Sequence, residues 1–394
     1  MDKKVIILGV TGGIAAYKSA QLISNLVKKG HEVHVIMTKN ATEFVTPLTF
    51  EVLTNNKVAV DTFDRNFDYN VNHVSLAKKA DLFVVAPATA NVLAKFAAGI
   101  ADDMLTTSYL AFTCPTLVAP AMNTAMLEHV ATRRNMEILR QDGVHFVESG
   151  TGYLACGDVG AGRLADIADI EEEIEFLLAT DKKLTGKKIV ITAGPTQESL
   201  DPVRFISNHS SGKMGYALAR IARNLGAQVV LITGPTNLTP PRGVEVIQVI
   251  SATNMYLAAK THCDYDIFIA AAAVSDYRSA KYLNQKLKKG KADGMTLALM
   301  QNEDIVATVA KNKQSSQKVV AFAMETENLV ENAKRKLVAK QVDMVVANDL
   351  TEFGAGFKGD TNKAVLVTTK TTEELPLMSK DELALEILER VVAL

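Results

Sequence analysis

The sequence lacks the features that mark secreted, membrane or nucleic-acid-binding proteins. Its three cysteines, Cys114, Cys156 and Cys263, are far apart and form no CxxC pair, which argues against a disulfide framework and a zinc site. The net charge of -1 gives no general attraction to nucleic acid or anionic membranes. No apolar run has the length of a transmembrane helix, and the first residues lead into a predicted strand without a signal-peptide pattern. We therefore expect a cytoplasmic protein without nucleic-acid or membrane partners.

Two common nucleotide-binding fingerprints are also missing. The first glycine-rich segment, GVTGGIAAYK, matches neither GxGxxG nor GxxxxGK[ST]. Farther on, SNHSSGKM has Ser207 where a P-loop needs glycine and Met214 where it needs Ser or Thr, and no GxGxxG with a suitably placed acidic partner occurs. These absences count against a nicotinamide-dependent oxidoreductase made of two Rossmann-like domains, a rival interpretation that a cofactor assay tests.

One local pattern does occur, and it occurs twice. Residues 3–15, KKVIILGVTGGIA, and residues 184–196, LTGKKIVITAGPT, run from a lysine pair through a β-branched stretch into a glycine turn. Such a pattern predicts a buried parallel strand whose carboxyl end enters a ligand loop. Because 394 residues exceed the usual size of one core, we expect an α/β protein with two tandem Rossmann-like three-layer domains, residues 1–180 and 187–394, joined by a linker at residues 181–186.

Small and polar residues follow each predicted strand of the first half. Glycines before a helix let backbone N–H groups approach a phosphate, although a tight strand-to-helix turn alone would also explain them. After the later strands, hydroxyl and backbone groups are placed where a ligand could use them. The candidate cofactor-binding residues are Gly9, Thr11, Gly12 and Gly13 in the first turn, Thr38 after the second strand, and Pro87, Ala88, Thr89 and Asn91 after the third.

Three other residues of the first half are of types that take part in catalysis. His73 lies at a short predicted helix, where a surface or helix-start histidine is the commoner interpretation. Asn123 follows the predicted strand at residues 116–119 and is equally suited to cap the next helix. Cys156 lies in GTGYLACGDVGAGRLAD, whose five glycines suggest a mobile flap with a partly exposed thiol.

The motifs GVTGGIAAYK, NHVSLA, PATAN with Lys95, AGIADD, PAMN and YLACGDVGAGR, in this order, resemble the flavin-dependent cysteine decarboxylases, most closely those that act on phosphopantothenoylcysteine. The resemblance covers residues 1–180 and implies a flavodoxin-like fold that binds FMN. It implies that flavin oxidises the thiol end of the substrate and that the thioaldehyde so formed takes up the electrons left by carbon dioxide. His73 is then the base-like group, Asn123 holds the substrate carboxylate and Cys156 donates the final proton. The family often has Ser where this chain has Gly13, so backbone N–H groups would hold the flavin phosphate.

The second half has its own polar loops at predicted strand ends. Residues 207–213, SNHSSGK, suit anion recognition before a helix, and a capped turn would explain them equally well. The small residues of AAAAVSDY allow a flat ring to lie against the backbone, with Asp276 at the strand end. The lysines of NQKLKKGK, among them Lys286, are more commonly solvated, but they would also offset the charge of a triphosphate. Lys336 and Lys340 lie four residues apart on one predicted helix face.

The motifs ITAGPTxE, DPVRFISNHSSGKMG, AAAVSDYR, KLKK, AFAMET and VANDL, again in order, resemble the phosphopantothenate-cysteine ligases, which in bacteria are commonly fused behind the decarboxylase. The resemblance implies that CTP activates 4'-phosphopantothenate as an acyl-cytidylate, which cysteine attacks, with Mg²⁺ or Mn²⁺ neutralising the triphosphate. It assigns Asn208 to the acyl intermediate and Lys286 to activation, and it leaves the metal ligands unassigned. The CTP and substrate contacts that it implies are Arg204, Ala273, Asp276, Glu303, Asp304, Ile305, Val306, Phe322, Lys336 and Lys340, with Glu303 standing where the family usually has Pro.

Together the two resemblances predict a bifunctional enzyme of coenzyme A synthesis with small-molecule substrates: 4'-phosphopantothenate, cysteine and CTP. The family's flavin sites lie between subunits, so a homo-oligomer is expected. A rival of another class is a non-catalytic regulatory flavoprotein, as exists among relatives of the first half. Cys156 and the complete set of ligase motifs disfavour that rival.

Overall fold

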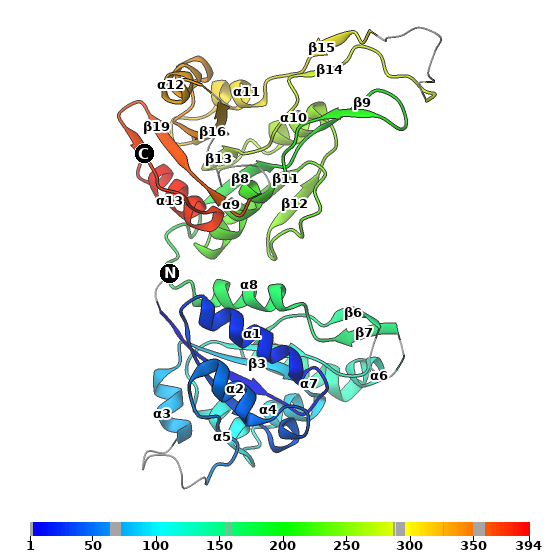
Figure 1. Ribbon diagram of the computed structural model, residues 1–394, viewed down its shortest axis with the longest axis vertical. Coiled ribbons are helices and arrows are strands. Elements are labelled where there is room, and N and C mark those ends of the chain that lie inside the picture. Colours follow the sequence, from blue (N-terminus) through cyan, green and yellow to red (C-terminus); the bar gives the residue numbers. More distant parts are fainter. Residues whose placement is uncertain are drawn as a thin grey trace. The chain divides into compact units, whose positions relative to one another are not determined.

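The computed structural model describes residues 3–63, 72–153, 157, 159–286, 288, 296–325, 327–349 and 359–394. The chain divides into two compact units, Met1–Thr180 and Asp181–Leu394, and each has its own main sheet (Figure 1). Residues 181–186, the expected linker, fold onto the second unit, where the Leu184 amide donates to the Leu225 carbonyl at 2.9 Å and the Leu184 side chain is buried. Within the described ranges, no helix is both long and apolar enough to cross a membrane.

The first unit contains a five-stranded parallel sheet with the strand order β2-β1-β3-β4-β5. This is the flavodoxin-like order, in which ligands bind beyond the carboxyl ends of the strands near the point where the order reverses. The flavodoxin-like fold predicted for the first half is therefore confirmed. Its elements are β1 (Val5–Val10), α1 (Ala16–Lys28), β2 (Glu32–Met37), the 3-10 helix η1 (Lys39–Glu43), α2 (Pro47–Thr54), α3 (Asn72–Lys79), β3 (Leu82–Ala88), α4 (Ala90–Ala98), α5 (Met104–Ala111), β4 (Thr116–Pro120), α6 (Thr124–Glu128), α7 (Val130–Gln141), β5 (His145–Phe146), the hairpin β6 (Gly150–Tyr153) and β7 (Val159–Arg163), and α8 (Ile167–Leu178).

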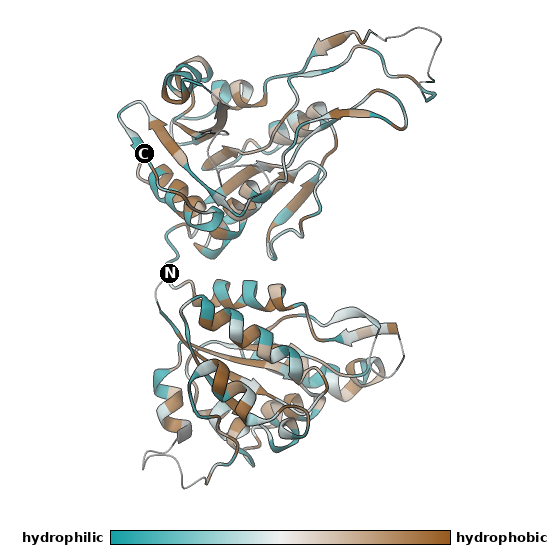
Figure 2. Cartoon of the chain, viewed as in Figure 1, coloured by the Kyte–Doolittle hydropathy of each residue, from teal (hydrophilic) through white to brown (hydrophobic). Residues whose placement is uncertain are grey.

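Two apolar cores lie on opposite faces of this sheet, as strand alternation requires. Ile6 and Leu8 of β1 pack with α1, α2 and α8, whereas Ile7 packs with α4, α5 and α7. Helix α1 buries Leu22, Ile23 and Leu26 at the spacing of one helical face. Figure 2 shows the sheet strands in brown, between helices that also carry hydrophilic teal segments. This three-layer packing fixes the carboxyl ends of β1, β3 and β4 side by side.

The second unit contains an eight-stranded sheet with the order β12-β11-β8-β13-β16-β17-β19-β20. The first six strands pair in parallel, while β19 pairs antiparallel with β17 and with β20. The elements are β8 (Lys188–Ala193), β9 (Gln197–Ser199), β10 (Phe205–Ser207), α9 (Lys213–Asn224), β11 (Gln228–Thr233), β12 (Glu245–Gln248), α10 (Ala252–Thr261), β13 (Ile267–Ala270), β14 (Tyr277–Ser279), β15 (Leu299–Gln301), α11 (Ile305–Asn312), β16 (Lys318–Glu325), α12 (Leu329–Lys340), β17 (Met344–Asp349), β18 (Thr361–Asn362), β19 (Ala364–Thr368), β20 (Thr372–Glu374), β21 (Met378–Ser379) and α13 (Lys380–Val392).

This second sheet is also covered on both faces. Ile189 and Ile191 of β8 pack with α9 and α13, whereas Val190 packs with α10, α11 and α12. Helix α13 begins with a capping box, in which the Ser379 hydroxyl accepts from the Glu382 amide and the Glu382 carboxylate accepts from the Ser379 amide. The prediction of two Rossmann-like three-layer folds is confirmed, because each unit has a mainly parallel sheet between two helical layers.

Candidate active sites

Thr11 ties together two strand-end turns of the first unit. Its buried hydroxyl donates to the Pro87 carbonyl at 2.8 Å and accepts from the Thr89 amide at 3.1 Å. Thr89 in turn begins α4, where its hydroxyl accepts from the Val92 amide at 3.4 Å. The turn after β1 is thereby held beside the turn after β3. Because these contacts use the only hydroxyl proton of Thr11, the structure gives that side chain an internal role.

The three glycines considered for phosphate binding have different surroundings. A Cβ atom at Gly9 would lie 2.6 Å from Leu105 Cδ1, and one at Gly12 would lie 2.5 Å from Asn40 Cβ, so both positions are closely packed. A Cβ atom at Gly13 would meet nothing closer than 3.8 Å. Gly9 is thus required by the core and Gly12 by the loop after β2, while a side chain at Gly13 would make only an ordinary van der Waals contact.

The other cofactor candidates of the first unit lie around the same edge of the sheet. Thr38 begins η1, with its hydroxyl accepting from the Ala41 amide at 3.3 Å. Pro87 and Ala88 are buried at the end of β3, so their backbone is the part that a ligand would meet, and Asn91 is exposed in the first turn of α4.

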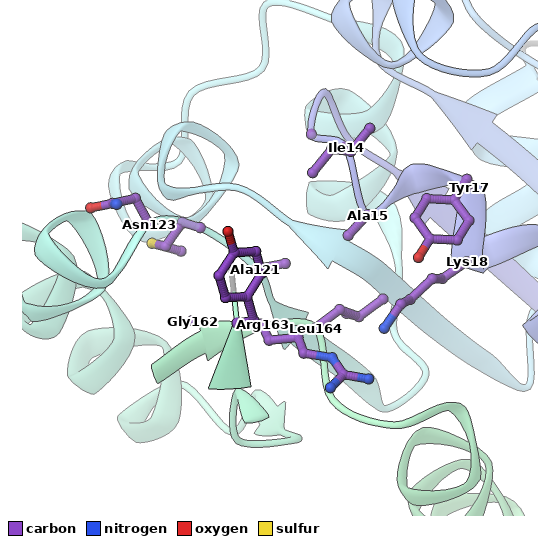
Figure 3. A pocket seen from close by; sticks show the side chains of 12 residues that line it. Ile14, Ala15, Tyr17, Lys18, Ala121, Asn123, Gly162, Arg163 and Leu164 are labelled. Carbon is purple, nitrogen blue, oxygen red and sulfur yellow. The ribbon is translucent and has the colours of Figure 1, made fainter. Parts of the chain in front are cut away.

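A cavity of about 500 Å³ lies where α1, the turn after β4 and strand β7 come together (Figure 3). Gly13, Lys18, Asn123 and Arg163 are among the residues that line it. In Figure 3 the amino group of Lys18 and the guanidinium of Arg163 lie on one side of the cavity, and Asn123 lies on the other. Burial and the neighbouring Arg163 charge lower the pKa of Lys18, while Asp166 opposes them. The two cations repel each other, so the cavity is suited to an anion.

Asn123 has the capping role that its sequence context allowed, and it also lines the cavity. Its side-chain oxygen accepts from the Ala125 amide at 2.8 Å and so begins α6. The Asn123 side chain is therefore held in one orientation in the turn between β4 and α6. His73 and Cys156 are the other two residues of the first half that were predicted to be catalytic. His73 belongs to α3, but its side chain is outside the described part of the structure, and Cys156 is outside the described residues altogether.

The β6–β7 hairpin is docked on the turn that carries Asn123. The Met122 amide donates to the Gly162 carbonyl at 2.9 Å, and the Thr124 hydroxyl donates to the Ala161 carbonyl at 2.7 Å. Gly162 has a φ of +124°, and a Cβ atom there would lie 2.2 Å from the Met122 carbonyl oxygen. Close packing is therefore the reason for a glycine at position 162, and the mobility predicted for the flap stays a prediction.

Lys95 and the acidic pair of AGIADD form an ion-pair cluster. The Lys95 ammonium lies 2.6 Å from Asp102 and 3.4 Å from Asp103, and Asp103 caps α5 through the Thr106 amide. The hydrogen bond to Asp102 is the main cause that raises the pKa of Lys95. This cluster fastens the end of α4 to the start of α5.

Three glycine turns meet at the carboxyl edge of the second unit's sheet. Gly194 and Gly212 have φ values of +73° and +81°, and a Cβ atom on either would lie 2.8 Å from the Thr236 methyl group. At Gly234 a Cβ atom would lie 1.8 Å from the Pro195 carbonyl oxygen. The first two turns are predicted from the sequence and the third is not, although TGPTN repeats the GPT of AGPT and is a usable signal.

Asn208 and Ala273, both predicted site residues, are in direct contact. The Asn208 side-chain amide donates to the Ala273 carbonyl at 3.1 Å, and the Ala273 amide donates to the Gly194 carbonyl at 2.9 Å. Arg204 is held by the buried carboxylate of Asp201, which lies 3.1 Å from its guanidinium and also accepts from its backbone amide at 2.8 Å. The loop that presents Asn208 is thus built on Asp201, which the sequence analysis did not identify.

A cavity of about 210 Å³ lies at the carboxyl ends of β8, β13 and β16. It brings together eight of the predicted residues: Asp276, Glu303, Asp304, Ile305, Val306, Phe322, Lys336 and Lys340. Four others, Arg204, Asn208, Ala273 and Lys286, do not line it, and Lys286 is exposed. We refer to this space as the nucleotide cavity, after the CTP contacts that the resemblance in the sequence predicts for these residues.

The polar wall of the nucleotide cavity is held by ion pairs. Lys340 pairs with Asp304, and the Lys336 ammonium donates to the Phe322 carbonyl at 2.7 Å. Burial pushes the pKa of Asp304 upward, but the Lys340 ammonium, the Ala307 amide and Lys336 outweigh it and keep this pKa below its ordinary value. The aspartate therefore stays ionised at neutral pH and fixes the lysine that shares the cavity with it.

Arg278 and Asn302 are polar residues of this region that the sequence analysis did not single out. The Arg278 guanidinium donates to the Asn302 side-chain oxygen at 2.7 Å and to the Glu303 carboxylate at 3.1 Å. Glu303, which stands in place of the family's usual proline, therefore gains a specific partner. Among the described residues, no group of three or more His, Cys, Asp or Glu side chains is placed to hold a metal ion.

The folds and cavities define a class of protein, a two-domain α/β protein with a candidate ligand cavity in each domain. Comparison with known families makes this specific. The family model described as Flavoprotein matches residues 1–178, and the model described as DNA/pantothenate metabolism flavoprotein C-terminal domain matches residues 184–394. The coenzyme A biosynthesis bifunctional protein CoaBC of Bacillus subtilis (strain 168) is 47% identical over 399 residues, which cover 100% of this chain and 98% of that protein.

The chain therefore belongs to the family of coenzyme A biosynthesis bifunctional proteins, CoaBC. It is a bifunctional enzyme of coenzyme A biosynthesis, and the resemblance identified in the sequence is confirmed. The crystal structure of the C-terminal domain of a CoaBC protein has 41% identity and a TM-score of 0.46, covering 54% of this chain and 96% of that one. The crystal structure of the FMN-dependent cysteine decarboxylase SpaF has 34% identity and a TM-score of 0.40, covering 44% of this chain and 95% of that one.

Proposed function

We propose that the second domain joins cysteine to 4'-phosphopantothenate using CTP, and that the first domain decarboxylates the product to 4'-phosphopantetheine using FMN. The observation that carries this proposal is the presence of one cavity at the carboxyl edge of each parallel sheet. Gly13 and Asn123 line the first, and Asp276 and Lys336 line the second. Each cavity thus contains residues that the resemblance assigns to the chemistry of its own domain.

The residues of the first cavity fit a phosphate-bearing cofactor. The turn after β1 leads into the 13-residue helix α1, and Gly13 leaves its backbone open to the cavity. A helix N-terminus attracts anions, and Lys18 and Arg163 add two positive charges that suit the phosphate groups of FMN and of the substrate. When bound, FMN would take two electrons from the thiol end of the substrate, which makes loss of the carboxylate possible, and would return them afterwards, so that 4'-phosphopantetheine forms with no net redox change.

The protein side of the decarboxylation is positioning and proton transfer. Asn123 is fixed as the cap of α6, so its side chain meets the substrate carboxylate in a defined orientation. His73 acts as the base at the substrate. Cys156, which lies between β6 and β7 in the sequence, gives a proton to the enethiolate that remains after carbon dioxide leaves.

The ligase reaction proceeds in two displacements. A carboxylate oxygen of 4'-phosphopantothenate attacks the α-phosphorus of CTP, and pyrophosphate leaves with the bonding electrons. The amine of cysteine then attacks the acyl carbon, CMP leaves and the amine loses a proton. Lys286 stabilises the phosphate charge of the first step, Asn208 holds the acyl-cytidylate, and Mg²⁺ or Mn²⁺ enters with CTP. Lys336 and Lys340 hold the nucleotide in its cavity.

Two variants test the division of labour. Cys156→Ser should abolish release of 4'-phosphopantetheine while CTP-dependent formation of CMP continues, because the ligase residues are untouched. Asn208→Asp should stop CMP formation while decarboxylation of supplied 4'-phosphopantothenoylcysteine continues. The assays follow CMP release from phosphopantothenate, cysteine and CTP, and carbon dioxide release from supplied 4'-phosphopantothenoylcysteine. Equal loss of both activities in either variant contradicts two independent sites, and a purified protein without flavin absorbance after addition of FMN contradicts the assignment of the first domain.

The assembly and location belong to the same proposal. Exposed apolar side chains of the first unit lie at and beside helices α1 and α2, where Ile14, Tyr17, Leu48 and Val52 are 57, 60, 64 and 75% exposed. Such a surface suits contact with further copies of the chain. The protein is then a cytoplasmic homo-oligomer, and sedimentation of the purified full chain measures its size.

A further inference from the structure

Ser275 carries a buried hydroxyl beside the nucleotide cavity that the described residues leave without a hydrogen-bond partner. The residue is 6% exposed, so water cannot readily satisfy that hydroxyl. A hydroxyl kept from water without a partner costs free energy, and native proteins seldom retain one without a use. The position therefore calls for a functional explanation.

The rest of Ser275 is fixed on both sides. Its backbone amide donates to the Thr196 hydroxyl at 3.0 Å, and its backbone carbonyl accepts from the Asn302 side-chain amide at 2.7 Å. Asn302 is itself held by Arg278 at 2.7 Å. The backbone on which the hydroxyl stands is thus anchored to the turn after β8 and to the segment before α11. A side chain anchored in this way is presented to a ligand without prior rearrangement of the backbone.

Two other buried side-chain atoms in the described part of the chain also have no partner, His31 Nδ1 and Asn348 Oδ1. Neither residue lines the nucleotide cavity, whereas Ser275 lines it next to Asp276. A serine hydroxyl donates one hydrogen bond and can accept two. A cytidine nucleotide offers donors and acceptors on its base and ribose, and acceptors on its phosphates.

We infer that Ser275 is a nucleotide-binding residue of the ligase, whose hydroxyl forms a hydrogen bond to CTP and is left unpaired in the free enzyme. This inference rests on the proposed CTP-dependent ligase function. It has an unusual consequence: the hydroxyl costs the free protein stability and contributes only when nucleotide is bound. Removing it should therefore affect stability and CTP affinity in opposite directions.

The test compares Ser275→Ala with the unaltered full chain and with Ser279→Ala. Ser279 is a matched control on the same segment, because its hydroxyl already donates to the Lys281 carbonyl at 2.8 Å and it does not line the cavity. CTP with Mg²⁺ is titrated calorimetrically, and thermal unfolding is recorded without nucleotide. For Ser275→Ala we expect a rise of about 3- to 10-fold in Kd for CTP, the value of one neutral hydrogen bond. Its Tm without nucleotide should be unchanged or higher, and Ser279→Ala should bind CTP normally.

Each other outcome has a definite meaning. If Ser275→Ala binds CTP as tightly as the unaltered chain, the inference is wrong while the ligase assignment stands. If its Tm without nucleotide falls as well, the hydroxyl has a structural partner and the inference is also wrong. If the unaltered chain binds no CTP, the proposed ligase function fails, and the inference falls with it. Decarboxylation of supplied 4'-phosphopantothenoylcysteine should be the same in all three proteins.

Discussion

Replacement of Gly13 by serine should strengthen FMN binding. Gly13 lines the first cavity, and a Cβ atom there would meet its nearest neighbour, Thr89 Cγ2, at 3.8 Å, which is an ordinary van der Waals distance. Its φ is not in the left-handed region, so a side chain causes no backbone strain. The new hydroxyl would stand at the N-terminal turn before α1, where the proposal places the flavin phosphate.

The size of the gain follows from these contacts. A hydrogen bond to a charged group contributes about 1.5–3 kcal/mol, and ordering one small side chain removes a few tenths of this. A net gain of about 1–2 kcal/mol corresponds to about 5- to 30-fold tighter binding. No compensating loss is expected, because the site has room for the two added heavy atoms.

Titration of FMN with flavin-free protein, followed by quenching of flavin fluorescence, measures this affinity. Gly13→Ala adds the Cβ atom without the hydroxyl and should leave the Kd unchanged. Gly12→Ser is the opposite control, because its Cβ atom would lie 2.5 Å from Asn40 Cβ and 3.0 Å from the Asn40 carbonyl carbon, so it should weaken binding. If Gly13→Ser binds FMN no more tightly than Gly13→Ala, the phosphate does not lie at this turn and the reasoning is refuted.

Two further predictions concern the first unit. Gly162→Ala places a Cβ atom 2.2 Å from the Met122 carbonyl oxygen at a φ of +124°, which costs about 1–3 kcal/mol of stability, and it should lower decarboxylation at least about tenfold without changing CMP release. Gly150→Ala is the control, because a Cβ atom there would have 3.8 Å of clearance. Equal effects of the two variants would contradict a local packing cause. Burial and, to a smaller extent, the Lys29 charge lower the pKa of His31 below its ordinary 6.5. The unfolded chain therefore protonates this histidine more readily than the folded chain does, and the free energy of unfolding falls as the pH drops below about 6.5. His31→Asn should reduce the loss of Tm between about pH 7 and about pH 5, and an unchanged pH dependence would mean that other groups cause it.

The central strands could be predicted from the sequence because burial on both faces leaves an unbroken apolar run. The strand predicted at residues 116–119 is β4, Thr116–Pro120, and the two lysine-pair patterns at residues 3–15 and 184–196 contain β1, Val5–Val10, and β8, Lys188–Ala193. The antiparallel edge was not predicted. β20 is three residues long and β21 two, too short for a periodic pattern, and β19 is placed by pairing with β17, which no local pattern encodes.

The structure brings eight of the predicted CTP-contact residues together in the nucleotide cavity, whereas Gly13 alone of the predicted cofactor-binding residues lines the first cavity. These eight residues follow from motifs, because they lie at the ends of strands and helices whose order the sheet fixes. The partners that hold them were missed, since Arg278, Asn302 and Asp201 act through long-range contacts that a motif does not describe. For His73 and Cys156 the assigned roles stay predictions.

Thr11 and Ser275 show why residue type at a strand end does not decide function. Both are small hydroxyl residues next to a ligand turn, and both are almost completely buried. The Thr11 hydroxyl forms hydrogen bonds with the Pro87 carbonyl and the Thr89 amide, and these bonds hold two turns together. The Ser275 hydroxyl has no such partner in the described structure, so a partner for it must come from outside the described residues. Thr11 was assigned to a ligand from the sequence and Ser275 was not, although of these two hydroxyls it is that of Ser275 that has no partner among the described residues. The partners that make this difference lie far away in sequence, and a local motif therefore does not reveal it.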